Sequence, residues 1–156
     1  MPSELLDITL PTTLERARED AIASGLAFAG SVSPPEAWAL AASGQAVLVD
    51  VRSNEERVFV GYVPGSVHVP WATGTALNRN PRFVRELEAK LGGKDKAILL
   101  LCRSGKRSAL AAEAAAKAGF SLVFNVAQGF EGELDEHHQR GRLDGWRSLG
   151  LPWVQE

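Results

Sequence analysis

The stretch "ILLLCRSGKRSALAAEAAAKAGF", residues 98 to 120, decides the fold and raises the question of function. An apolar run leads into a short loop with three positive charges and then into an alanine-rich segment. This order predicts a buried strand over 97–101, a tight loop and a helix over 109–118. The loop opens on Cys102, the only cysteine of the chain. Cys102 is therefore either a small buried hydrophobe at a strand end or a reactive thiol beside an anion site.

The same alternation extends along the rest of the chain. Short runs rich in valine and leucine predict further strands over 46–51, 67–69 and 122–126. Residues that cap or stop helices predict four more helices. The first two are a helix over 13–24, capped by Thr12 or Thr13, and a helix that begins after the cap Ser33 and ends at Gly44. The other two are a helix over 55–60, capped by Asn54, and a helix over 81–93, which follows Asn80.

Strands that are apolar along their whole length and alternate with helices predict an α/β fold, in which helices cover both faces of a parallel sheet. In open sheets of this kind, ligands bind beyond the carboxyl ends of the strands. The strand 97–101 would deliver Cys102 to that edge.

The bulk properties favour a single soluble domain. The chain has 156 residues, 45% of them hydrophobic, and a net charge of -2, which argues against a nucleic-acid surface. We expect no membrane span, no signal peptide and a cytoplasmic location. The single cysteine excludes an intrachain disulfide, and zinc-type cysteine pairs are absent, so we expect no metal or cofactor. The pair His137–His138 favours a solvated helix in "LDEHHQRGR", residues 134–142, over a metal site.

The residues around Cys102 favour thiol chemistry. A thiol is nucleophilic only as the thiolate, and cations or a helix start lower the ordinary cysteine pKa of about 8.5. Arg103, Lys106 and Arg107 supply the cations, and Ser108 is placed to cap the following helix. Ser104 and Gly105 are small enough to let backbone N–H groups turn inward as an anion cradle.

Three segments resemble the motifs of rhodanese domains. "LVDVRSNEERVFVGYVPGSVHVP", residues 48–70, resembles their first signature, an Asp-x-Arg strand end with an acidic pair and a proline–glycine turn. "CRSGKRS", residues 102–108, resembles their active-site loop, and "VFNVAQGFEGELD", residues 123–135, resembles a later strand and glycine turn. The resemblance spans residues 32–154. It implies a central parallel sheet, typically five-stranded, flanked by helices, in a rhodanese domain over 31–156 that follows an N-terminal helical extension over 1–30.

The resemblance also implies an activity. Cys102 would attack the sulfane sulfur of thiosulfate or another donor, become a persulfide, and pass the sulfur to cyanide or to a thiol or protein acceptor. An alternative is a persulfide carrier or protein-interaction module with little thiosulfate turnover. Phosphatases that share this fold have a loop one residue longer, so the spacing from Cys102 to Arg107 favours sulfur over phosphate.

Further residues are carried over from the family pattern. Asp50 and Arg52 would form an ion pair that braces loops at the sheet edge. In a second interpretation, Arg52 would also add positive potential at the substrate site. Glu56 would brace a helix start. Arg103 and Lys106 would face the donor, whereas Arg107 would either do the same or orient the loop against a carboxylate. Two positions depart from the family pattern: Tyr62 stands where a histidine is frequent, and Phe130 stands where a second glycine is usual. Phe130 would be either a wall of the pocket or a core aromatic, and Trp71 would lie either in the core or at the rim of the site. His68 is interpreted as a structural histidine.

Overall fold

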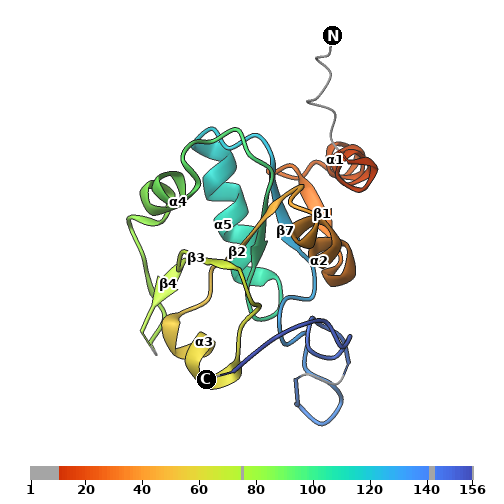
Figure 1. The fold of residues 1–156 in the computed structure, drawn as a ribbon, viewed down its shortest axis with the longest axis vertical. Coiled ribbons are helices and arrows are strands. Elements are labelled where there is room, and N and C mark those ends of the chain that lie inside the picture. The colour runs from red at the N-terminus through yellow and green to blue at the C-terminus, as the bar shows by residue number, and fades with distance from the viewer. Residues whose placement is uncertain (1–10, 75, 141–142, 156) are drawn as a thin grey trace.

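The computed structural model describes residues 11–74, 76–140 and 143–155. Its centre is a five-stranded parallel sheet in the order β1-β7-β6-β2-β3 (Figure 1). The strands are β1 Gly30–Val32, β2 Val47–Asp50, β3 Val67–His68, β6 Ile98–Leu101 and β7 Val123–Val126. A separate antiparallel pair consists of β4 Ala72–Thr73 and β5 Asn78–Arg79. The expected parallel, five-stranded α/β fold is confirmed.

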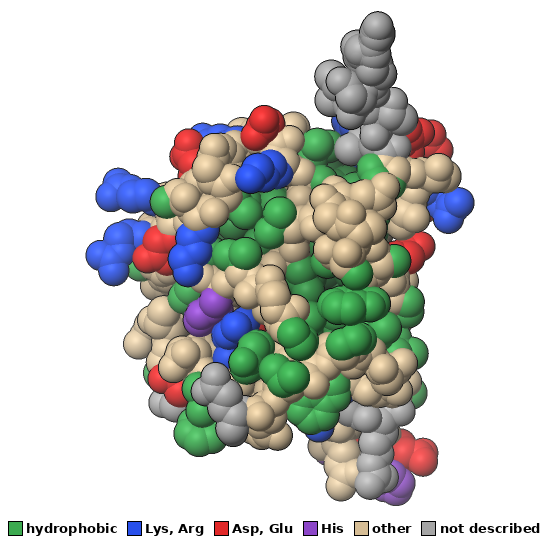
Figure 2. Space-filling model, in the orientation of Figure 1, with side chains coloured by type: hydrophobic (Ala, Val, Ile, Leu, Met, Phe, Trp, Pro, Cys, Tyr) green, Lys and Arg blue, Asp and Glu red, His purple; other side chains and the backbone are tan. Residues whose placement is uncertain are grey.

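Helices cover both faces of this sheet because successive strand residues point to opposite sides. The helices are α1 Thr12–Ser24, α2 Pro34–Ala42, α3 Asn54–Val60, α4 Phe83–Leu91 and α5 Lys106–Lys117. Leu100 packs with α4 and α5 in one core cluster, whereas its neighbour Leu99 packs with α1 and α2 in the other. Figure 1 shows α3 beside the C-terminal segment, at the end of the molecule far from α1. Figure 2 shows charged side chains gathered over α4.

The register of the sheet places the functional segments at one edge. Asp50, the last residue of β2, lies beside Leu101, the last residue of β6. Because the strands are parallel, the segments that follow them leave from the same carboxyl edge. Cys102 and Arg52 are therefore delivered to one side of the sheet by neighbouring strands.

Several expected helix starts differ in detail. Ser33 does cap α2, with Glu36 completing a capping box. In α3, however, the cap is Ser53 rather than Asn54, because the Ser53 hydroxyl accepts from the Glu56 N–H while Glu56 accepts from the Ser53 N–H. Neither Thr12 nor Thr13 caps α1, whose N-cap is Pro11.

The expected helix over 134–142 is wrong for its described part, 134–140, which contains a turn at 136–137 and no helix. The Asp135 carboxylate accepts from the backbone N–H groups of His137 and Gln139, at 2.8 and 2.9 Å. His138 has a left-handed φ of 61°. An aspartate that bonds nearby backbone in this way competes with helix formation. Residues 141 and 142 lie outside the described residues.

The N-terminal helix α1 packs into one of the two core clusters. Its Leu14 and Ala17 are buried in the same cluster as Val32 of β1. The division of the chain at residue 30 stays a prediction, and residues 1–10 of that expected extension lie outside the described residues. Within the described residues, no helix is both long and apolar enough to cross a membrane.

Candidate active site around Cys102

The loop from Cys102 to Arg107 turns the end of β6 into the start of α5. Gly105, with a φ of 101°, reverses the chain and brings its own N–H to 3.1 Å from the Cys102 sulfur. Positive φ values of this size favour glycine, which explains the residue at this point. Cys102 is 1% exposed, so its sulfur lies at the base of the loop. Its surroundings are a backbone amide and a helix start.

The segment after β7 holds this loop from below. The N–H of Phe130 donates to the carbonyl of Cys102 at 2.8 Å, and the N–H of Glu131 donates to that of Arg103 at 2.9 Å. Gly129 makes the close approach possible, because a Cβ there would lie 2.6 Å from the carbonyl oxygens of both Cys102 and Arg103. The glycine of the third motif is thus a packing requirement of the loop.

Ser108 contacts the sulfur directly instead of capping the helix. The helix begins at Lys106, and the buried Ser108 hydroxyl lies 3.3 Å from the Cys102 sulfur. The same hydroxyl is hydrogen-bonded to the side-chain oxygen of Asn125 in β7, and the Asn125 amide nitrogen donates to the Gly105 carbonyl at 3.2 Å. Asn125 therefore connects both groups that contact the sulfur. Sequence reasoning missed it, although a lone asparagine inside "VFNV" is a polar residue within a buried strand.

Arg107 is directed away from the loop, toward Glu56 of α3. Two hydrogen bonds of 2.8 and 2.7 Å join its guanidinium to the Glu56 carboxylate. Burial opposes the charge on Glu56, but the bonds from Arg107 and the Ser53 N–H, with the charges of Arg107 and Arg52, lower the pKa of Glu56 to about 2. The hydrogen bonding of the Arg107 guanidinium, which donates to Glu56, raises the pKa of Arg107. Of the two expected uses of Arg107, the geometry matches the one in which it braces the loop on a carboxylate.

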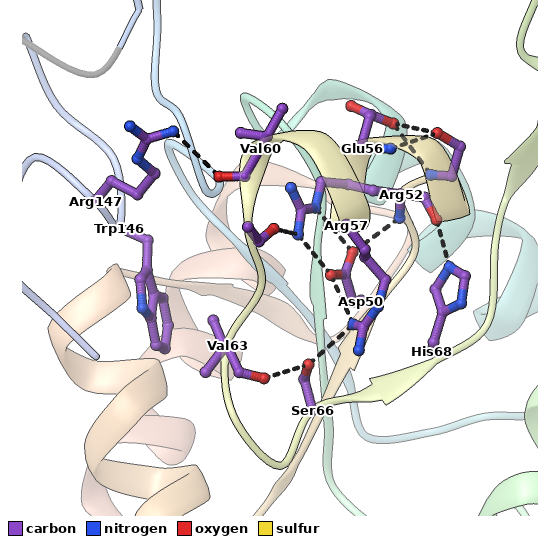
Figure 3. Close-up of polar contacts among 12 residues, drawn as sticks. Asp50, Arg52, Glu56, Arg57, Val60, Val63, Ser66, His68, Trp146 and Arg147 are labelled. Carbon is purple, nitrogen blue, oxygen red and sulfur yellow. Dashed lines mark hydrogen bonds and ion pairs between the residues drawn. The ribbon is translucent and has the colours of Figure 1, made fainter. Parts of the chain in front are cut away.

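Asp50 and Arg52 form a buried ion pair at the same sheet edge. Arg52 donates from Nε and Nη2 to the two Asp50 oxygens at 3.0 and 2.8 Å, and from Nη2 to the Gly61 carbonyl at 2.7 Å. Figure 3 shows the Asp50 carboxylate between Arg52 and Arg57, which also donates to it at 3.0 Å. The Arg52 guanidinium stacks on Phe130 at 4.3 Å. The backbone N–H of Phe130 donates to the Cys102 carbonyl. The contact between Arg52 and Phe130 therefore supports the loop through the segment that follows β7.

Arg103 and Lys106 are the exposed cations of the loop. Within the described parts of the chain, neither has an ion pair with a carboxylate. Their charges are therefore available to an anion, unlike that of Arg107. Ser104, the next residue of the loop after Arg103, is half-buried.

The remaining aromatic and histidine positions are structural. Phe130 is fully buried, as expected of a core aromatic, and Trp71 packs edge-on against Phe83 in the core. The ring of Tyr62 lies under the Arg57 guanidinium at 4.6 Å. His68 Nε2 donates to the Arg52 carbonyl at 2.7 Å, and burial lowers the pKa of its ring (Figure 3). Among the described residues, no group of three or more His, Cys, Asp and Glu side chains could hold a metal ion.

Comparison with known proteins agrees with the fold of the domain. A model of the rhodanese-like domain matches residues 33–135. The human thiosulfate:glutathione sulfurtransferase is 33% identical over 114 residues, which cover 71% of this chain and 98% of that protein. The chloroplastic thiosulfate sulfurtransferase 16 of Arabidopsis thaliana is 32% identical over 78% of this chain and 90% of its own length. The crystal structure of Rv0390 from M. tuberculosis covers 83% of this chain and 99% of its own, with 41% identity and a TM-score of 0.73.

Proposed function

The chain belongs to the rhodanese-like domain family, and on this basis we propose that it is a single-domain sulfurtransferase whose nucleophile is Cys102. The sulfane sulfur would come from thiosulfate, the donor in the names of two relatives. The acceptor would be a thiol or, in the assay, cyanide.

One observation carries this proposal. The Cys102 sulfur lies within reach of the Gly105 N–H and the Ser108 hydroxyl, in a loop that also carries Arg103 and Lys106, which have no ion pair among the described residues. The Gly105 N–H is a donor aimed at the sulfur and stabilises it as an anion, whereas the Ser108 hydroxyl donates its one hydrogen to Asn125 and packs against the sulfur. The cations attract a dianionic donor to it. A core cysteine that serves only as filler needs neither feature.

The reaction is a double displacement. The Cys102 thiolate attacks the outer sulfur of thiosulfate, a sulfur–sulfur bond forms at Cys102, and sulfite leaves with the electron pair of the broken bond. An acceptor thiolate or cyanide then attacks the outer sulfur of the Cys102 persulfide. The Cys102 sulfur leaves as a thiolate, and the loop is restored. Because the chain has one cysteine, a thiol acceptor must come from another molecule.

The other residues would prepare this reaction without touching sulfur. Arg107 and Glu56 would fix the start of α5 against α3, and Asp50 with Arg52 would fix the Phe130 segment beneath the loop. Holding the donors in place before the reaction is what makes them effective, since no reorganisation is then needed as charge moves. Ser104 would complete the wall of the loop.

The test is thiocyanate formation from thiosulfate and cyanide by the purified chain. We expect turnover that is abolished in Cys102→Ser, with thiosulfate alone raising the intact mass of the unmodified chain by one sulfur atom. Cys102→Ser tests the nucleophile with little change in volume, and circular dichroism checks that it folds. Turnover that survives in Cys102→Ser would refute the proposal.

The same measurements separate the enzyme from a persulfide carrier. A carrier would gain the sulfur atom from a protein persulfide donor but not from thiosulfate. Loading by thiosulfate alone would support the enzyme, and loading only by the protein donor would support the carrier.

A further inference from the structure

A pocket opens beside the loop from Cys102 to Arg107, called the sulfur loop below, between α3 and the turn that follows β4. Its volume is about 280 Å³, and its walls include Glu55, Phe59 and Val60 from α3, Leu77 from the turn and Arg103 from the loop. Arg103 follows Cys102 directly in the chain. The pocket therefore reaches the loop at its rim, whereas the sulfur lies at the base of the loop.

Its apolar wall is exposed in a way that the fold does not require. Phe59 is 74% exposed although it is one of the largest side chains of α3. Leu77 is 38% exposed and has a φ of 54°, in the left-handed region that a bulky residue rarely adopts. Strained residues of this kind cluster at sites that clamp ligands. Apolar side chains held open to solvent beside a reactive thiol suit a ligand that brings an apolar group.

The polar groups of the pocket differ in whether they already have partners. The charge of Glu56, at the pocket's edge, is taken by Arg107. Glu55 and Arg103 have no ion pair within the described chain, so they offer one carboxylate and one guanidinium to a ligand. A peptide segment has matching groups, since its N–H groups can donate to a carboxylate and its acidic side chains can pair with a guanidinium.

We propose, resting on the sulfurtransfer proposed above, that this pocket binds the peptide around the acceptor cysteine of a protein thiol. The residue after that cysteine would place an apolar side chain against Phe59 and Leu77, and an acidic residue before it would pair with Arg103. The acceptor thiolate attacks the outer sulfur of the Cys102 persulfide, a new sulfur–sulfur bond forms on the peptide, and Cys102 leaves as a thiolate. The proton of the acceptor thiol goes to the solvent. Cyanide has no apolar group that could pack against Phe59 and Leu77, so it would not use this pocket.

The experiment starts from the Cys102 persulfide, loaded with thiosulfate, checked by intact mass and freed of excess donor. The loaded protein is mixed with the peptide Gly-Asp-Cys-Phe-Gly or Gly-Asp-Cys-Gly-Gly, and the loss of the added sulfur is followed over time. We expect the phenylalanine peptide to remove the sulfur about ten-fold faster, because filling an apolar pocket gives discrimination of this order. Replacing its aspartate by asparagine should slow the reaction, since the pairing with Arg103 is lost.

Variants of the pocket locate the effect. In Phe59→Ala, the rate with the phenylalanine peptide divided by the rate with the glycine peptide should fall close to one. Leu77→Gly should also lower this ratio, and glycine tolerates the positive φ at this position. Ile22→Ala is the matched control, because Ile22 is 79% exposed on α1, far from the loop, and should keep the full ratio. Equal rates for both peptides on the unmodified chain, or an unchanged ratio in Phe59→Ala, would overturn the proposal. A chain that thiosulfate does not load would instead contradict the sulfurtransferase function itself.

Discussion

Arg107 in the first turn of α5 and Glu56 in the first turn of α3 are joined by two charge-assisted hydrogen bonds, although they lie 51 residues apart in sequence. Both side chains are largely buried, with 16% and 17% exposed. Glu56 also belongs to the capping box of α3, so one carboxylate ties a helix start to the sulfur loop. Two-point pairing of this kind fixes direction as well as distance.

The ion pair predicts an acid-sensitive contribution to stability. The pKa of Glu56 is lowered from 4.5 to about 2, so the folded state favours the ionised form. Its contribution is complete above pH 4.5 and is lost as the pH falls toward 2. The shift corresponds to about 3 kcal/mol of unfolding free energy. We expect Glu56→Gln to lose about this amount at pH 7, measured by urea unfolding, and the difference from the unmodified chain to shrink as the pH is lowered.

Glu55→Gln is the control for that experiment. It removes a carboxylate from the adjacent position of the same helix, but Glu55 has no ion pair within the described residues. A loss in Glu55→Gln as large as in Glu56→Gln would mean that the effect comes from helix charge and not from Arg107.

Asn125 is predicted to act on sulfur chemistry through Ser108 and Gly105. Asn125→Ala removes the amide that bonds to both, so the Ser108 hydroxyl and the Gly105 carbonyl lose their fixed positions. Small displacements of a reacting group cost large factors in rate, and we expect thiosulfate turnover to fall about ten-fold or more. The rate of Cys102 alkylation by iodoacetamide at a fixed pH reports on the sulfur without any sulfur donor, and it should change in Asn125→Ala.

The comparison variant is Asn80→Ala. Asn80 is also a buried asparagine with side-chain bonds, to the Pro70 carbonyl and Glu86, but it lies at the start of α4. Asn80→Ala should affect stability and leave the alkylation rate unchanged. An unaltered alkylation rate in Asn125→Ala would argue that Asn125 serves the fold alone.

Much of this architecture could be predicted from sequence, and the failures have physical causes. The run "ILLL" and the alanine-rich helix predicted β6, the loop and α5 because burial and periodicity are local signals. Strand β1 is the three residues Gly30–Val32, defined by pairing with β7 rather than by any apolar run. The partner of Arg107 could not be read from sequence, because nothing near it indicates Glu56. Asn125 was visible only as a polar residue in an apolar strand, without its partners.

Replacing Gly129, which contacts the sulfur loop, is predicted to lower both stability and the rate of sulfur transfer. In Gly129→Ala the new Cβ would lie 2.6 Å from the Cys102 and Arg103 carbonyl oxygens, at a φ of 67°. Crowding of this kind adds to the strain of a left-handed residue, so we expect about 3 kcal/mol of lost stability and slower sulfur transfer. Gly44→Ala shares the positive φ, 78°, but meets open space, and should cost only about 1 kcal/mol. Equal costs for the two variants would show that backbone strain alone, and not contact with the loop, explains Gly129.

The last prediction concerns α1, which the sequence places in a separate extension. Leu14 is fully buried with Val32, Leu99 and Phe124, so it lies on the sheet itself. Removing its side chain would leave a cavity in that core, and Leu14→Ala should lower the unfolding free energy by about 3 kcal/mol. Ile22, on the exposed side of the same helix, provides the matched control, and Ile22→Ala should change it by less than about 0.5 kcal/mol. Urea unfolding at neutral pH measures both. If Leu14→Ala were as mild as Ile22→Ala, α1 would be an appendage that the domain does not need.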